Sequence, residues 1–120
     1  MSDTGGAHDA PVAGVEERGD ALIVKLTGEL DLYNAHLVRD ELAAAAARGP
    51  VRLIVDLSEL TFIDSTGLGV LIEARKRLAN PRAFMLVAPG LETQRALEIA
   101  GLDRLFAVES SLDDALSASL

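Results

Sequence analysis

The chain pairs a helical pattern with a buried-strand pattern, and this combination most constrains its fold. Residues 33–48 carry apolar side chains at the spacing of one helix face, namely Ala35, Val38, Leu42 and Ala45. Gly49-Pro50 ends this helix, and the nearly continuous apolar run of residues 51–57 follows it. Such a run indicates a buried strand that is reached through a helical crossover. The sequence therefore predicts a βαβ unit with parallel strands.

Two apolar segments precede this unit. Residues 12–17 and 21–27 are rich in β-branched and aliphatic side chains, and Arg18-Gly19-Asp20 separates them. A short glycine-containing link between two such segments is typical of a hairpin. The first two strands are therefore expected to pair antiparallel.

Helical and strand patterns alternate through the rest of the chain. The sequence predicts helices over 65–79 and 91–100, strands over 83–88 and 106–108, and a terminal helix. Gly101 is expected to close the helix before it, and Ser110 with Asp113 is expected to form a capping box for the terminal helix. The predicted order is ββαβαβαβα.

These elements define the fold class. The chain is predicted to be a single α/β domain, with a mixed sheet of four to five strands and about four helices mainly on one face. Its 120 residues fit one domain of ordinary size. Residues 1–11 are expected to be a disordered lead, so that the domain covers residues 12–120.

The charge balance excludes several classes of partner. Eleven Lys and Arg against nineteen Asp and Glu give a formal net charge of −8, which repels nucleic acid and anionic membranes. The absence of cysteine excludes disulfides, thiolate metal sites and cysteine nucleophiles. No segment approaches the roughly 20 apolar residues of a membrane span, and the N-terminus lacks the pattern of a secretory signal. We therefore expect a cytoplasmic protein without nucleic-acid or membrane contacts.

The sequence offers no set of catalytic residues. His8 and His36 lack further ligands at metal-binding spacing, and Ser65 lacks the G-x-S-x-G context of a hydrolase nucleophile. Phosphate-binding fingerprints of the P-loop and G-x-G-x-x-G types are also missing. We therefore expect neither an enzyme nor a metal or other cofactor. A small nucleotide-binding protein that uses the carboxyl edge of the sheet stays open as an alternative.

The segment from Val55 to Leu71 carries more polar and glycine residues than a simple strand-to-helix connection needs. Its simplest interpretation is a strand, a loop and a helix whose N-cap is Asp64 or Ser65. However, a cap needs only one such side chain, and two glycines in a helix cost about 1 kcal/mol each relative to alanine. This segment is therefore our candidate for a functional site.

Three runs in the chain resemble the signatures of the STAS domain family, in its anti-sigma factor antagonist branch. They are Phe62-Ile63-Asp64-Ser65-Thr66-Gly67-Leu68-Gly69-Val70-Leu71, the earlier Leu26-Thr27-Gly28-Glu29-Leu30-Asp31, and the later Ala100-Gly101-Leu102-Asp103-Arg104-Leu105-Phe106. The resemblance covers nearly all of the chain after Val12. It adds an expected function to the fold predicted from the sequence pattern.

The resemblance implies a switch in which an anti-sigma factor, itself a serine kinase, phosphorylates Ser65. The hydroxyl of Thr66 is the alternative phosphorylation site. The unphosphorylated form would bind the anti-sigma factor and release its sigma factor, and a serine phosphatase would reset the switch. The expected partner-binding residues are Glu29, Asp31, Asp56, Asp64, Ser65, Thr66, Gly67 and Leu68.

Glu29, Asp31 and Asp56 are included because each follows or ends a predicted strand, so that they are expected to converge near Ser65 at the carboxyl edge of the sheet. Their alternative role is to form turns and cap loops. An exposed strand edge would also allow a homodimer. The alternative within the same family is a soluble STAS subunit of a lipid or anion transport complex.

Overall fold

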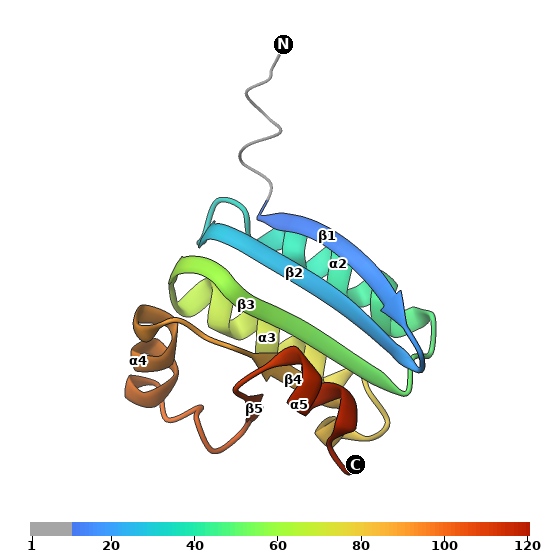
Figure 1. Ribbon diagram of the computed structural model, residues 1–120. Helices are drawn as coiled ribbons and strands as arrows, with labels where there is room; N and C mark the ends of the chain where they lie inside the picture. Colours follow the sequence, from blue (N-terminus) through green and yellow to red (C-terminus); the bar gives the residue numbers. More distant parts are fainter. Residues whose placement is uncertain (1–10) are drawn as a thin grey trace.

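The computed structural model describes residues 11–120, and the order of its elements confirms the predicted ββαβαβαβα sequence (Figure 1). The strands are β1 (Val12–Arg18), β2 (Ala21–Leu30), β3 (Arg52–Ile63), β4 (Phe84–Val87) and β5 (Ala107–Glu109). The helices are α2 (Ala35–Ala47), α3 (Ser65–Lys76), α4 (Leu91–Ile99) and α5 (Leu112–Ser117), with a short 3₁₀ turn, η1 (Pro81–Ala83), before β4. The lead predicted over residues 1–11 lies outside the described residues except for Pro11.

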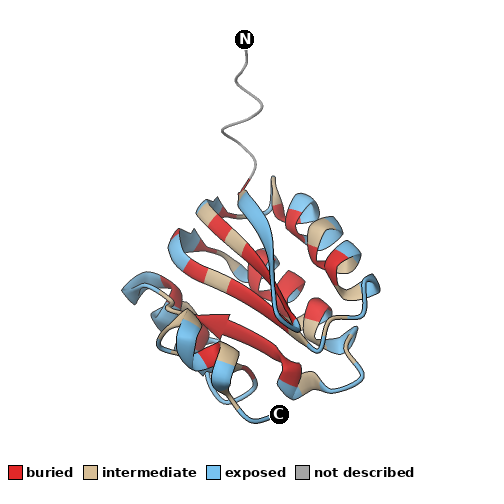
Figure 2. Ribbon diagram, turned by 45° about the vertical axis from the view of Figure 1, so that its right-hand side comes forward, coloured by how far each residue is buried: buried red, intermediate tan, exposed pale blue. Residues whose placement is uncertain are grey.

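The five strands form one mixed sheet in the order β1-β2-β3-β4-β5. β1 and β2 pair antiparallel as the predicted hairpin, with Arg18 opposite Ala21 at the turn. The other neighbours are parallel, and Val55 in β3 lies between Val24 of β2 and Leu86 of β4. The central strands are accordingly the most buried part of the sheet, whereas β1 is exposed along most of its length (Figure 2).

Helices cover the two faces of the sheet unequally. The larger core lies under α2, α3 and α4, and all four residues of the predicted apolar stripe of α2 are buried in it. The smaller core lies on the opposite face, where Ala115 of α5 packs near Ile23, Ile54 and Met85 of the strands. The prediction of helices mainly on one face is therefore confirmed. None of the helices within residues 11–120 is both long and apolar enough to cross a membrane.

β3 is much longer than the strand predicted from its apolar run. The strand continues past Leu57 to Ile63, so the predicted loop before the helix is wrong. Two shifts of register in the β2–β3 ladder accompany this extension, one of them beside Gly28, whose φ of 73° is a left-handed value. Such irregularities bend strands and increase their local twist.

The ends of the last two helices test the predicted caps. Gly101 closes α4 with a φ of 73°, and the amides of Gly101 and Leu102 donate to the carbonyls of Glu98 and Leu97, which is a Schellman motif. The cap of α5 is Ser111 rather than Ser110, because the Ser111 hydroxyl oxygen accepts from the amide of Asp114. The predicted N-cap is therefore displaced by one residue.

Arg52 of β3 connects the sheet to α5 and the residue after it through hydrogen bonds. Its side chain is only 14% exposed, and Nη1 donates to the carbonyl oxygens of Ala115 and Ala118, at 3.1 and 2.6 Å. We expect Arg52→Leu to lower the free energy of unfolding by about 2 kcal/mol, because these carbonyls lose a charged donor. Arg48→Leu is the control, since its ion pair with Glu17 is exposed and should contribute less than about 1 kcal/mol. Equal losses in urea unfolding of the two variants would contradict this role of Arg52.

Candidate functional site

The carboxyl ends of β2 and β3 meet at one edge of the sheet, at their left-hand ends in Figure 1. Leu30 and Ile63 are paired in register there, and both are buried. The chain leaves β2 through residues 31–34 and enters α2, while it passes from β3 through Asp64 directly into α3. This register places the β2–α2 loop beside the beginning of α3.

Asp64 is the N-cap of α3 and contacts both segments. One carboxylate oxygen, Oδ1, accepts from the amide of Gly67 at 2.9 Å, and the other, Oδ2, accepts from the amide of Leu32 at 3.0 Å. The backbone amide of Asp64 donates to the carbonyl of Leu30. The sequence alone did not decide whether Asp64 or Ser65 is the N-cap, and the structure assigns this role to Asp64.

Ser65 and Thr66 occupy the first turn of α3 and are exposed. Because Asp64 supplies the cap, the Ser65 hydroxyl is not needed to begin the helix. The unpaired amides and the dipole at a helix N-terminus favour an anion nearby. A negatively charged group attached to Ser65 is therefore compatible with the fold.

The β2–α2 loop is organised by its own polar side chains. Asp31 Oδ1 accepts from the amide of Tyr33 at 2.9 Å, and Asn34 Nδ2 donates to the carbonyl of Glu29 at 2.7 Å. These bonds leave two apolar side chains at the surface, Leu32 at 65% and Tyr33 at 85% exposure. Neither was predicted as a site residue, and Tyr33 was predicted to begin the helix. The available signal was that both lie outside the apolar stripe of that helix.

Glu29 and Phe62 lie side by side at the same edge. They are paired in the β2–β3 register, Glu29 is exposed, and Phe62 is 47% exposed. Phe62 is therefore only partly buried, in contrast to its neighbour Ile63, which is 6% exposed. We define the edge surface by the exposed and half-buried residues at this end of β2 and β3, in the β2–α2 loop and at the start of α3: Glu29, Asp31, Leu32, Tyr33, Phe62, Asp64, Ser65 and Thr66. It combines three carboxylates with three apolar side chains and contains no Lys or Arg.

Gly67 and Leu68, which were also predicted as partner contacts, are buried beneath this surface. Leu68 is 7% exposed and belongs to the larger core. A Cβ at Gly67 would lie 2.8 Å from side-chain carbons of both Ile63 and Leu30, and 3.1 Å from the Leu30 carbonyl oxygen. Both residues therefore set the position of α3 against the strands.

Asp56 lies far from Ser65, which corrects the prediction that it converges there. Because β3 continues for seven residues beyond Asp56, at about 3.3 Å per residue, Asp56 is roughly 20 Å from the end of the strand. Its Oδ1 accepts from the amide of Ser58 at 2.9 Å. The hydrogen bond and charge of Glu59, with a contribution from Asp56, raise the pKa of nearby Lys25 above its usual value.

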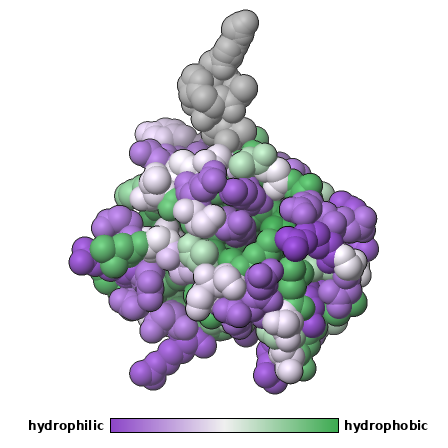
Figure 3. Space-filling view, viewed as in Figure 1, coloured by the Kyte–Doolittle hydropathy of each residue, from purple (hydrophilic) through white to green (hydrophobic). Residues whose placement is uncertain are grey.

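Asp56 and Lys25 instead line a shallow groove of about 320 Å³ beside α5. This groove lies on the face seen in Figure 3, where hydrophilic side chains surround a narrower apolar area. It includes no residue of the edge surface.

Gly69 lies on α3 one turn beyond Ser65, on the same exposed face. In contrast to Gly67, a Cβ at Gly69 would have no atom within 4 Å. We expect Gly69→Ala to raise the free energy of unfolding by about 0.5–1 kcal/mol, because alanine restricts the unfolded chain and favours the helix. Thermal unfolding measures this effect, and a lower midpoint would contradict the open position that the structure gives this residue.

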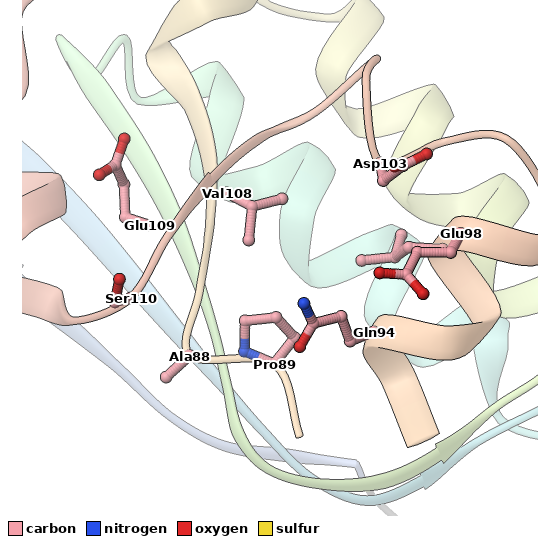
Figure 4. A pocket seen from close by; sticks show the side chains of 9 residues that line it. Ala88, Pro89, Gln94, Glu98, Asp103, Val108, Glu109 and Ser110 are labelled. Carbon is pink, nitrogen blue, oxygen red and sulfur yellow. The ribbon is translucent and has the colours of Figure 1, made fainter. Parts of the chain in front are cut away.

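A second hollow, of about 520 Å³, lies where α4 faces the ends of β4 and β5. Gln94, Glu98 and Asp103 lie along one side of it, and Glu109 and Ser110 along the other (Figure 4). Its lining includes three carboxylates and no Lys or Arg, which is unfavourable for the phosphates of a nucleotide. None of its lining residues was predicted as a site residue.

Comparisons with known proteins connect this arrangement to one family. The model of the STAS domain matches residues 13–115. The anti-sigma-F factor antagonist RsfB of Mycobacterium tuberculosis is 31% identical over 111 residues, which are 92% of this chain and 91% of that protein. An anti-sigma-B factor antagonist of Listeria monocytogenes is 34% identical over 99 residues, covering 80% and 86% of the two chains. The crystal structure of an anti-sigma factor antagonist from Mycobacterium paratuberculosis superposes with a TM-score of 0.81 at 34% identity, covering 87% of this chain and 89% of that one.

Proposed function

Since this chain belongs to the STAS domain family, we propose that it is an anti-sigma factor antagonist whose unphosphorylated form binds an anti-sigma factor and releases the sigma factor. The observation that carries this proposal is the exposed Ser65 hydroxyl, which is free of the capping role and lies within the edge surface. The names of the similar proteins support the same function. The chain then acts as a binding module that accepts a phosphate, and it needs no catalytic residues of its own.

The edge surface suits a partner with basic and apolar side chains. Leu32, Tyr33 and Phe62 supply exposed apolar area, and aromatic side chains are frequent anchors in protein interfaces. Glu29 and Asp31 add negative charge beside them, which would attract Arg or Lys on the anti-sigma factor. Association with such a partner should therefore become slower as the salt concentration rises.

Phosphorylation of Ser65 by the anti-sigma factor would end this association. A phosphate adds about −1.5 to −2 charges at pH 7, next to Asp64 and within a surface already rich in carboxylates. The N-terminus of α3 tolerates this charge, so the fold persists. The partner's interface, shaped for a neutral hydroxyl, would meet repulsion and the cost of removing water from the phosphate. A serine phosphatase would restore the binding form, and these reactions belong in the bacterial cytoplasm.

A kinase assay tests this proposal. The purified chain is incubated with ATP and with each anti-sigma factor serine kinase of its own bacterium, and the modified residue is located by mass spectrometry. We expect one phosphate on Ser65, none in the Ser65→Ala variant, and unchanged modification of Thr66→Ala. Phosphate on Thr66 instead of Ser65 would show that Thr66 is the residue that the kinase modifies.

The absence of both complex formation and phosphorylation with all of these kinases would contradict the proposed function. Specific retention by a membrane transport complex would instead support the STAS subunit of a transporter.

A further inference from the structure

Asp64 joins the two halves of the edge surface. Its Oδ1 accepts from Gly67 within α3, while its Oδ2 accepts from the amide of Leu32 in the β2–α2 loop, 32 residues away along the chain. Both carboxylate oxygens are therefore engaged, in different segments. The hydrogen bonds of Asp31 and Asn34 described above stay within the loop and the end of β2, whereas the bond from Leu32 to Asp64 connects the loop to α3.

The segment held in this way carries the most exposed apolar side chains of the edge surface. Leu32 and Tyr33 are adjacent in the loop, at 65% and 85% exposure. A side chain that binds a partner loses less conformational freedom when its backbone is already fixed. Asp64 fixes that backbone at Leu32, the residue directly before Tyr33. Asp64 itself is next in sequence to Ser65.

We propose that Asp64 is a positioning residue that holds Leu32 and Tyr33 in the orientation that binds the partner, and that a phosphate on Ser65 releases them. The phosphate oxygens are strong acceptors and would compete with Asp64 for the amides at the start of α3. The phosphate would also repel the neighbouring carboxylate. The first effect displaces Oδ1 from the Gly67 amide and the second pushes the carboxylate away from Ser65, so that Oδ2 no longer stays in place to accept from the Leu32 amide. This inference rests on the proposed function only where it concerns the partner.

Amide hydrogen exchange on the isolated protein tests the release without any partner. The full chain is produced with phosphoserine incorporated at position 65 during translation and is compared with the unmodified chain by NMR. We expect exchange of the Leu32 amide to become roughly tenfold faster, which corresponds to the loss of one hydrogen bond. The amide of Leu68, which donates to the Asp64 backbone carbonyl, serves as an internal control for the first turn of α3. Unchanged exchange at Leu32 would overturn the proposed release.

A second variant separates positioning from capping. Asp64→Ser keeps a side chain suited to the N-cap but has a single oxygen, so it can satisfy Gly67 and no longer reach Leu32. We expect intact protection of Leu68, faster exchange of Leu32, and about tenfold weaker binding to the anti-sigma factor identified by the kinase assay.

A double-mutant cycle then tests whether Asp64 acts through the loop. In a chain that already carries Leu32→Ala and Tyr33→Ala, Asp64→Ser should change the affinity by less than about twofold, because the side chains that it positions are gone. Equal losses of affinity in both backgrounds would overturn the positioning role. If the parent chain bound no anti-sigma factor, the proposed function would fail, and the exchange of Leu32 would still decide whether Asp64 holds the loop.

Discussion

Ser65→Asp is expected to bind the anti-sigma factor 100- to 1,000-fold more weakly than the parent chain, whereas Ser65→Ala should bind it with nearly the parent affinity. The expected loss corresponds to about 3–4 kcal/mol at 1.4 kcal/mol per tenfold. Its cause is a carboxylate that must lose water inside an interface which already contains Glu29, Asp31 and Asp64. Titration calorimetry with the purified partner measures the three affinities.

Ser65→Asn is the matched control for this charge effect. Asparagine has nearly the size and shape of aspartate but is neutral, so it should weaken binding by less than about tenfold. If the Asn and Asp variants lost affinity equally, side-chain size rather than charge would control the association. The electrostatic account of the switch would then be wrong.

Gly67→Val should destabilise the fold by about 3 kcal/mol, the largest effect on stability expected for a single residue of the candidate site. Its Cβ would lie 2.8 Å from carbons of Leu30 and Ile63, and the nearby Leu30 carbonyl belongs to a buried strand with little freedom to move. Inserting carbon atoms into a packed core typically costs about 1–3 kcal/mol, and valine adds three of them. The free energy of urea unfolding measures the loss.

Gly67→Ala and Gly69→Ala form a matched pair in the same helix. Gly67→Ala should destabilise the fold, because a Cβ at this position would contact Leu30 and Ile63. Gly69→Ala should stabilise it by about 0.5–1 kcal/mol, because its Cβ would face open space. A gain in stability for Gly67→Ala would show that α3 moves easily away from the strands. It would contradict the close packing that positions Ser65.

The alternation of strand and helix patterns was sufficient to predict the fold. The apolar stripe of α2 and the continuous run at the start of β3 are long and regular, and both predictions are confirmed. The extension of β3 could not be predicted in the same way. Its buried residues Leu57, Leu60 and Ile63 are spaced by three, because register shifts interrupt the ladder with β2. A strand pattern with a period of two does not fit this spacing.

The same irregularity explains the misplacement of Asp56. Its position after an apolar run predicted a strand end, but the strand continues to Ile63, so Asp56 lies away from the carboxyl edge where Glu29, Asp31 and Asp64 are found. A local pattern identified Ser65 at the start of its helix correctly. It could not predict the hydrogen bond from Leu32 to Asp64, because that contact depends on how two separate loops are placed.

The two glycines of α3 illustrate a further limit of sequence reasoning. Gly67 and Gly69 occur in the same short run and carry the same helix penalty. Their environments differ because one faces Leu30 and the other faces open space. This difference depends on the rotation of α3 against the sheet, which only the structure provides.

Release of the sigma factor from its complex with the anti-sigma factor is the step that the proposed switch controls. Fluorescently labelled sigma factor is bound to the purified anti-sigma factor, and its anisotropy is followed as this chain is added in unmodified form or with phosphoserine at position 65. We predict that the unmodified chain lowers the anisotropy to that of free sigma factor, while the phosphorylated chain requires at least about 100-fold higher concentration. Equal release by both forms, or no release by either, would contradict the proposed phosphorylation switch.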